Sequence, residues 1–235
     1  MREQQPIQAA FYKLDDKSKH EYQVRLNASI EVVSLLLNQG FAFCGHDESE
    51  SSLNKGNFLE VLSWLAARCD AIKPFVLEKS PKNNKMTSHD IQKDIVTACK
   101  IETVKATIED INSDYFALLV DESRDVSSKE KMAICLRYVN KMRFVMEAFI
   151  GLVHIKDTSA LSLKKAIVDL LAHHSLTLSN VRGQCYDGAR NMQGEIGGLK
   201  TLIRQESRSR SAHLFIVSLI NFNWLLLPFL TSVFK

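Results

Sequence analysis

The sequence is poor in cysteine, proline and glycine, and it carries little excess charge. Its 235 residues include 5 cysteines, 4 prolines and 9 glycines, and the net charge is +3. An odd number of widely spaced cysteines without a Cys-X-X-Cys pair argues against a disulfide framework, so we expect reduced thiols. A net charge of +3 is too small for the whole surface to attract nucleic acid, so any basic surface must be local.

Several common functional signatures are missing as well. The first residues, Met-Arg-Glu-Gln-Gln, have no apolar segment behind them, so no secretory signal is expected. Phosphate-binding loops, nucleophile elbows, HExxH zinc motifs and dinucleotide-binding glycine patterns do not occur. The apolar stretch 214–230 has only 17 residues and contains two asparagines and a proline, which favours a packing helix over a membrane span. We expect no membrane association.

The composition is that of a folded protein, and the apolar spacing predicts a helical first half. Apolar residues make up 46% and charged residues 24% of the chain, a balance typical of folded soluble proteins. Residues 1–20 are polar and are expected to be flexible. Apolar spacing predicts a helix over 21–39, a second helix that Asn57 caps, and a third that a Thr87–Asp90 capping box opens. Residues 21–112 are therefore predicted to form a helical region.

The hydrophobic period changes after residue 112. Unbroken or alternating apolar runs predict strands over 115–120, 132–139, 144–153 and 181–186. A helix that Thr158 or Ser159 caps precedes the fourth strand, and one further amphipathic helix, with Met192 and Ile203, follows it. The right-handed crossover rule makes the first and fourth strands parallel neighbours. The predicted class is α/β (α+β), with a helical region, a mixed sheet with flanking helices over 113–213, and an apolar tail over 214–235.

Two acidic residues follow predicted strands and are candidates for metal chemistry. Asp121 ends the first strand and Asp187 ends the fourth, so both carboxylates are expected at one edge of the sheet. Two close carboxylates repel unless a cation lies between them, and Mg²⁺ prefers oxygen ligands. Asp is also common at strand ends, and Asp187-Gly188 is a turn signal. On spacing alone, the structural interpretation has more weight than the metal site.

Other candidate sites have weaker patterns. A local basic stripe at steps of four, four and two could contact DNA phosphates, although a solvated helix end is the default interpretation; it comprises Lys200, Arg204, Arg208 and Arg210. The sequence His46-Asp47-Glu48 could supply metal ligands, but without a partner cluster we interpret it as a solvated loop. No zinc is expected.

Five segments resemble the hAT transposase superfamily, in the branch with TTF-type or MYM-type zinc fingers and a hAT dimerisation region. The more specific are residues 119–126 (Leu-Val-Asp-Glu-Ser-Arg-Asp-Val) and 182–192 (Arg-Gly-Gln-Cys-Tyr-Asp-Gly-Ala-Arg-Asn-Met). The others are 25–29, 45–58 and 157–161. The resemblance extends from about residue 11 to residue 213. It implies a partial RNase H-like core of the Asp-Asp-Glu type, with Asp121 and Asp187 as the first two metal-binding acids. It also implies a nuclear protein; without the resemblance, a cytoplasmic protein is expected.

The departures from that pattern predict a truncated, inactive core. Nothing has the ligand spacing of the zinc-binding DNA-recognition domain, and residues 210–213 read Arg-Ser-Ala-His where the family has Cys-Phe-Ala-His. The third acid and the dimerisation segment are not found before Lys235. Mg²⁺ is therefore expected only if the core is active.

Three functions remain open. The first is a non-catalytic transposase remnant. The second is a Mg²⁺-dependent nuclease that recruits Glu195 or Glu206 as its third acid. The third is a protein-interaction or nucleic-acid-binding module, in which the helical half or an exposed sheet edge binds a partner or a second copy.

Overall fold

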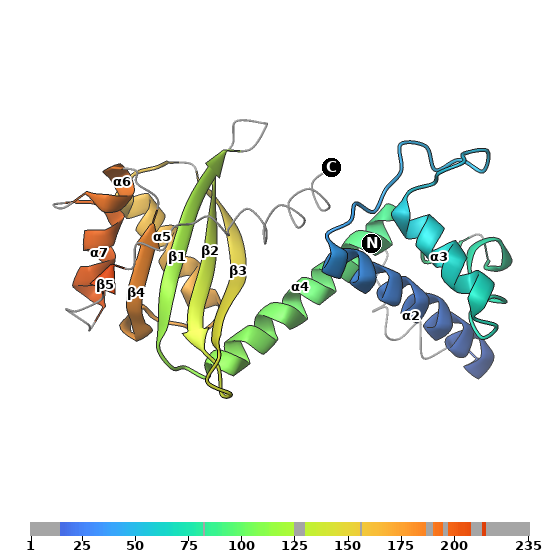
Figure 1. The fold of residues 1–235 in the computed structure, drawn as a ribbon, viewed down its shortest axis with the longest axis horizontal. Coiled ribbons are helices and arrows are strands. Elements are labelled where there is room, and N and C mark those ends of the chain that lie inside the picture. Colours follow the sequence, from blue (N-terminus) through green and yellow to red (C-terminus); the bar gives the residue numbers. More distant parts are fainter. Residues whose placement is uncertain are drawn as a thin grey trace, which may run out of the picture. The chain divides into compact units, whose positions relative to one another are not determined.

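The computed structural model describes residues 15–81, 83–124, 130–155, 157–186, 190–194, 197–207 and 213–214 (Figure 1). The described residues fall into two compact units, one up to Cys99 and the other from Lys100 onward. Each unit has its own cluster of buried side chains. The mixed α/β class predicted from sequence, with helices before a mixed sheet, is confirmed.

The first unit is helical, as the apolar spacing predicts. It contains α2 (Asp16–Gln39), α3 (Asn57–Arg68), the short 3-10 helix η1 (Leu77–Lys79) and the beginning of α4 (His89–Ile111), which continues into the second unit. Helix α2 begins earlier than predicted because the Asp15 side chain accepts a hydrogen bond from the Ser18 amide at 3.3 Å. The core of this unit includes Val33, Leu36, Phe58 and Leu62.

Two predicted caps are each wrong by one residue. Helix α3 is capped by Gly56, because the Asn57 side chain instead donates to the Ala42 carbonyl at 2.7 Å. At the start of α4, the Ser88 hydroxyl accepts from the Ile91 amide at 3.4 Å and the Ser88 carbonyl accepts from the Gln92 amide at 3.0 Å. Ser88 rather than Thr87 therefore occupies the capping position.

The second unit contains a mixed sheet. Its strands are β1 (Phe116–Arg124), β2 (Glu130–Val139), β3 (Val145–Ile155), β4 (Val181–Tyr186) and β5 (His213–Leu214), in the spatial order β3-β2-β1-β4-β5. Strands β1, β2 and β3 pair antiparallel, whereas β4 pairs parallel with β1 and with β5. The predicted parallel pairing of the first and fourth strands is confirmed.

Strand β1 continues four residues beyond its apolar run. Its polar end pairs with β2 from Asp121 opposite Ala133 to Arg124 opposite Glu130. The apolar run therefore marks the buried part of the strand, and hydrogen bonding to β2 extends it further.

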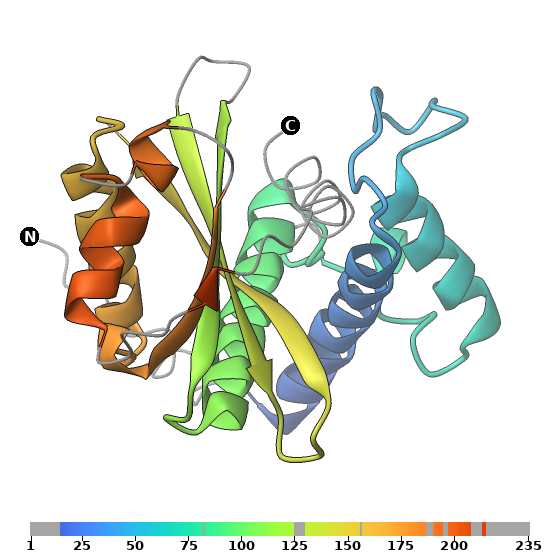
Figure 2. The ribbon, with the colours of Figure 1, turned by 60° about the vertical axis from the view of Figure 1, so that its left-hand side comes forward.

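Helices α5 (Ala160–His173) and α7 (Leu199–Glu206) lie side by side on one face of the sheet (Figure 2). Helix α6 (Arg190–Gln193) and the 3-10 helix η2 (Leu178–Asn180) flank β4 in sequence. Ser159 caps α5, one of the two residues predicted for this role. The core of this unit includes Leu118 and Val120 from β1, Ile134 and Leu136 from β2, and Leu163 and Ile167 from α5.

The single helix predicted after β4 is two helices. Gly194 and Gly198 lie so close that a Cβ atom on Gly198 would be 2.3 Å from the Gly194 nitrogen. The Gly198 amide also donates to the Gly194 carbonyl at 3.0 Å, which holds the end of α6 close to the start of α7. The spacing of apolar residues in the sequence does not reveal the break between α6 and α7. Met192 on α6 and Ile203 on α7 are both buried, so the apolar pattern continues across it.

No helix in the described part of the chain is both long enough and apolar enough to cross a membrane. Of the apolar stretch 214–230, only Leu214 is described, as the end of β5. All five cysteines lie in described segments, and none forms a disulfide.

Candidate functional site

Asp121 lies on β1 directly beyond the residues that pair with β4. Leu119 is opposite Cys185, and Val120 is opposite Tyr186, the last residue of β4. The Asp121 side chain is partly buried. Asp187 lies outside the described residues, so the predicted pair of carboxylates at this edge of the sheet stays a prediction.

The groups around Asp121 are buried and resist ionisation. The Tyr186 hydroxyl donates to the Gln184 side-chain oxygen at 2.8 Å, and burial, with a smaller contribution from Cys185, raises the pKa of Tyr186. Burial, then Glu147 and then Asp121, raises the pKa of Cys135 to about 12. A thiol with such a pKa is protonated near neutral pH, so Cys135 is not a nucleophile.

Asn191 connects this end of β1 with the helices that follow. Its side-chain amide donates to the Thr158 carbonyl at 3.1 Å and to the Glu122 carboxylate at 3.4 Å. Because Asn191 is on α6 and Thr158 precedes α5, these bonds hold both helix starts beside β1. Sequence patterns did not predict a role for Glu122 or Asn191, although each belongs to a motif that carries the resemblance.

Glu206, one of the two acids considered as a third metal ligand, is engaged elsewhere. Its carboxylate forms an ion pair with the Lys164 ammonium of α5. The other acid, Glu195, lies outside the described residues. Of the acids proposed for a metal site, the described segments thus contain Asp121 at the β1 edge and Glu206 in an ion pair between α5 and α7.

A comparison with protein families gives a match over residues 1–198 to the family described as "ZMYM1/FAM200, RNase-like domain". The match covers most of the chain, including β1 to β4 and the segment with Asn191. The chain belongs to this family. The RNase-like description agrees with the mixed sheet and its flanking helices.

Two curated proteins are distant relatives of this RNase-like domain. The human protein named "52 kDa repressor of the inhibitor of the protein kinase" is 21% identical over 177 residues, and its mouse counterpart is 20% identical over the same length. Each alignment covers 74% of this chain but 23% of the relative. The chain therefore spans about a quarter of the length of these relatives.

The basic stripe of the RNase-like domain is described only in part. Lys200 and Arg204 are four residues apart on α7, so they lie on one face of that helix. Arg208 and Arg210 lie outside the described residues. DNA contact through this stripe stays a prediction.

Proposed function

We propose that this RNase-like domain is a non-catalytic derivative of the hAT-type transposase core and that it acts in the nucleus. The observation that carries the proposal is the parallel pairing of β4 with β1, which ends beside Asp121. The Tyr186-Asp187 step follows this pairing in the sequence, so the chain keeps the order of strands and acids that the transposase resemblance implies.

The ion pair of Glu206 supports the absence of catalysis. Two-metal hydrolysis of DNA needs several carboxylates around the cations. Among the described residues, Asp121 is at the β1 edge, but Glu206 already neutralises Lys164. Because Asp187 and Glu195 lie outside the described residues, we assign no step to Mg²⁺. The name of the human relative, a repressor, also agrees with a role other than catalysis.

A plasmid assay tests this proposal. We expect the purified chain to leave supercoiled DNA intact in Mg²⁺ or Mn²⁺, because Glu206 forms an ion pair with Lys164 instead of completing the set of metal-binding acids. Gel electrophoresis measures nicked and linear products. The variants Asp121→Asn and Asp187→Asn should behave like the unchanged chain.

Cleavage that Asp121→Asn and Asp187→Asn abolish would overturn the proposal and establish the nuclease alternative. The matched control is Asp70→Asn, which changes an exposed acid of the helical unit. Cleavage that persists in all three variants would come from a contaminating nuclease.

A second candidate function, self-association, is favoured by the β2–β3 hairpin. Among the described strands, β3 is at one edge of the sheet, and the hairpin exposes several large apolar side chains. Met142 is 75% exposed and Phe144 is 62% exposed. Unpaired strand edges and exposed apolar side chains favour pairing with another chain. We propose a second copy of this chain as the partner of this edge.

The replacement Phe144→Ser should weaken this self-association. For the unchanged chain we expect light scattering to show an apparent mass that rises toward twice the monomer as concentration increases. In Phe144→Ser the rise should need roughly tenfold higher concentration, because the apolar contact of the ring is lost. The control Leu53→Ser removes an exposed leucine of the helical unit and should change nothing. A monomeric mass for the unchanged chain at all concentrations would reject this candidate.

A further inference from the structure

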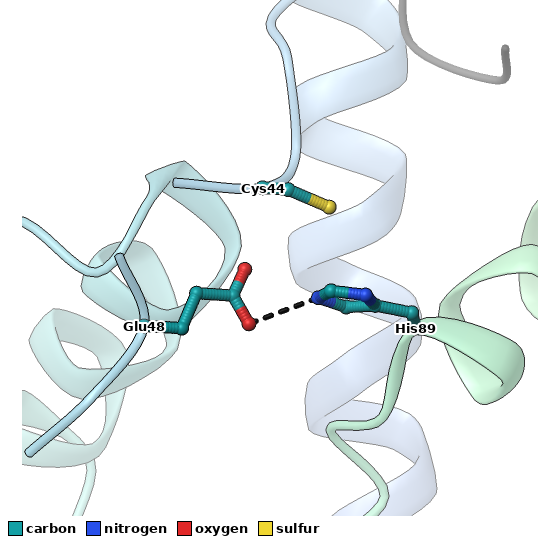
Figure 3. A group of neighbouring side chains, drawn as sticks. All are labelled: Cys44, Glu48 and His89. Carbon is teal, nitrogen blue, oxygen red and sulfur yellow. Dashed lines mark hydrogen bonds and ion pairs between the residues drawn. The ribbon is translucent and has the colours of Figure 1, made fainter. Parts of the chain in front are cut away.

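Three side chains of the helical unit that can bind a metal point toward one another (Figure 3). Cys44 and Glu48 lie in the loop after α2, and His89 is the first residue of α4. One ligand atom from each residue lies within 4.8 Å of the other two. Because His89 is 41 residues from Glu48 in sequence, ligand spacing does not reveal this cluster.

The interpretation of residues 46–48 as a solvated loop holds for His46 and Asp47, which are exposed, but Glu48 is partly buried.

The backbone around Cys44 is fixed by the segment that precedes α3. The Phe58 amide donates to the Phe43 carbonyl at 3.1 Å, next to Cys44. Gly45 and Gly56 approach so closely that a Cβ atom on Gly45 would be 2.8 Å from the Gly56 nitrogen. The thiol therefore projects from a backbone that is held on both sides.

Hydrogen bonds also position Glu48 and His89. The Gly45 amide donates to Glu48 Oε1 at 3.3 Å, which leaves Oε2 to contact His89 Nε2 at 2.9 Å. The Ser29 hydroxyl donates to the Met86 carbonyl at 2.8 Å, so the segment before α4 is attached to α2. The three ligand groups thus converge because of contacts that do not involve a metal.

We propose that Cys44, Glu48 and His89 form a Zn²⁺ site. Thiolate, imidazole and carboxylate are the three side-chain groups that bind Zn²⁺, whereas Mg²⁺ and Ca²⁺ prefer oxygen ligands alone. One thiolate and one carboxylate also neutralise the two positive charges of the ion. A fourth, open position would take a water molecule.

Binding of Zn²⁺ requires only small shifts of the three ligand atoms. Zn²⁺ bonds of about 2.0–2.3 Å in a tetrahedral arrangement place ligand atoms about 3.3–3.7 Å apart. The Glu48 Oε2 to His89 Nε2 distance of 2.9 Å would lengthen by about 0.4 Å, and the distances to the Cys44 sulfur, which are at most 4.8 Å, would shorten by about 1 Å. The His89 side chain is 53% exposed and Cys44 is exposed, so an ion can enter from solvent.

The simpler alternative is a Glu48–His89 hydrogen bond with a thiol nearby by chance. A hydrogen-bonded pair accounts for Glu48 and His89, but it gives no reason for the thiol to converge on them.

A bound ion would link the loop between α2 and α3 to the start of α4. Such a link stabilises the folded helical unit in proportion to the binding energy of the metal. This inference does not rest on the proposed function of the sheet, because all three ligands belong to the other unit.

Cobalt substitution of the metal-stripped full chain tests the site. Co²⁺ is the probe because its thiolate charge-transfer and tetrahedral d–d absorption bands report the ligands directly. We expect one Co²⁺ per chain to produce both bands and Zn²⁺ to displace it. Zn²⁺ should also raise the thermal unfolding temperature. Cys44→Ser should lose the charge-transfer band, and Glu48→Gln and His89→Gln should each weaken Co²⁺ binding about 100-fold or more.

Matched control variants distinguish this site from non-specific metal binding. Cys69→Ser, Glu50→Gln and His46→Gln change the same residue types outside the cluster and should keep the bands and the affinity. Absence of the thiolate band in the unchanged chain, or its persistence in Cys44→Ser, would overturn the site. Equal Co²⁺ affinity in the cluster variants and their controls would do the same. Because Cys44 is exposed, we expect Cys44→Ser to stay folded. This variant therefore tests the metal site even if His89→Gln unfolds the helical unit.

Discussion

Replacing Gly56 by alanine should destabilise the helical unit by about 2–5 kcal/mol. Gly56 has φ 92° and ψ 158°, a backbone region that residues with a Cβ atom almost never occupy. The added Cβ would also lie 2.2 Å from the Gly45 nitrogen and 2.6 Å from the Cys44 carbonyl carbon. Those neighbours are backbone atoms, so a change of side-chain rotamer cannot relieve the clash. Urea unfolding followed by circular dichroism measures the loss.

Gly197→Ala is the matched control for this substitution. A Cβ atom on Gly197 meets nothing within 4 Å, so the change in unfolding free energy should stay within about 0.5 kcal/mol. If Gly56→Ala unfolds at the same urea concentration as the unchanged chain, the close approach of the two loop segments is wrong. The convergence of Cys44 and Glu48 with His89 would then lose its structural basis, because the same approach positions Cys44.

Local patterns in the sequence predict most elements of the fold. The apolar runs locate all four longer strands, and the crossover rule places β4 beside β1. The errors arise where contacts between distant residues decide the outcome. Asn57 is a good cap by type, but a carbonyl 15 residues earlier takes its side chain. Pairing with β2 extends β1 past its apolar run, and the approach of two glycines divides α6 from α7.

The candidate sites show the same limit more strongly. An apolar run that ends at an acid predicts Asp121 at the end of a buried strand segment, and the β1–β4 pairing does end at the residue before it. The Asn191–Glu122 contact joins residues 69 apart, and the Glu48–His89 contact joins residues 41 apart. Neither separation is a recognisable ligand or hydrogen-bond spacing, because loops and helix starts supply the residues. Only the packing of the helices and strands brings such groups together.

Replacing Leu118 by alanine should destabilise the sheet unit by about 2–5 kcal/mol. Leu118 lies in the middle of β1, between β2 and β4, and its side chain is fully buried in the core that α5 covers. Removing its branched end leaves a cavity between the sheet and the helix, which close-packed neighbours fill only in part. Leu161→Ala is the control, because Leu161 is 69% exposed in the first turn of α5 and should change stability little.

Hydrogen exchange then shows whether the two cores unfold separately. In Leu118→Ala, amides of β1, β2 and β4 should exchange faster in proportion to the lost stability, whereas amides of α2 and α3 should keep their rates. The reason is that Leu118 belongs to one buried cluster, and Phe58 and Leu62 belong to the other. Equal acceleration in α2 and α3 would show that the two clusters unfold as one cooperative unit, so that loss of the sheet core also exposes Cys44, Glu48 and His89.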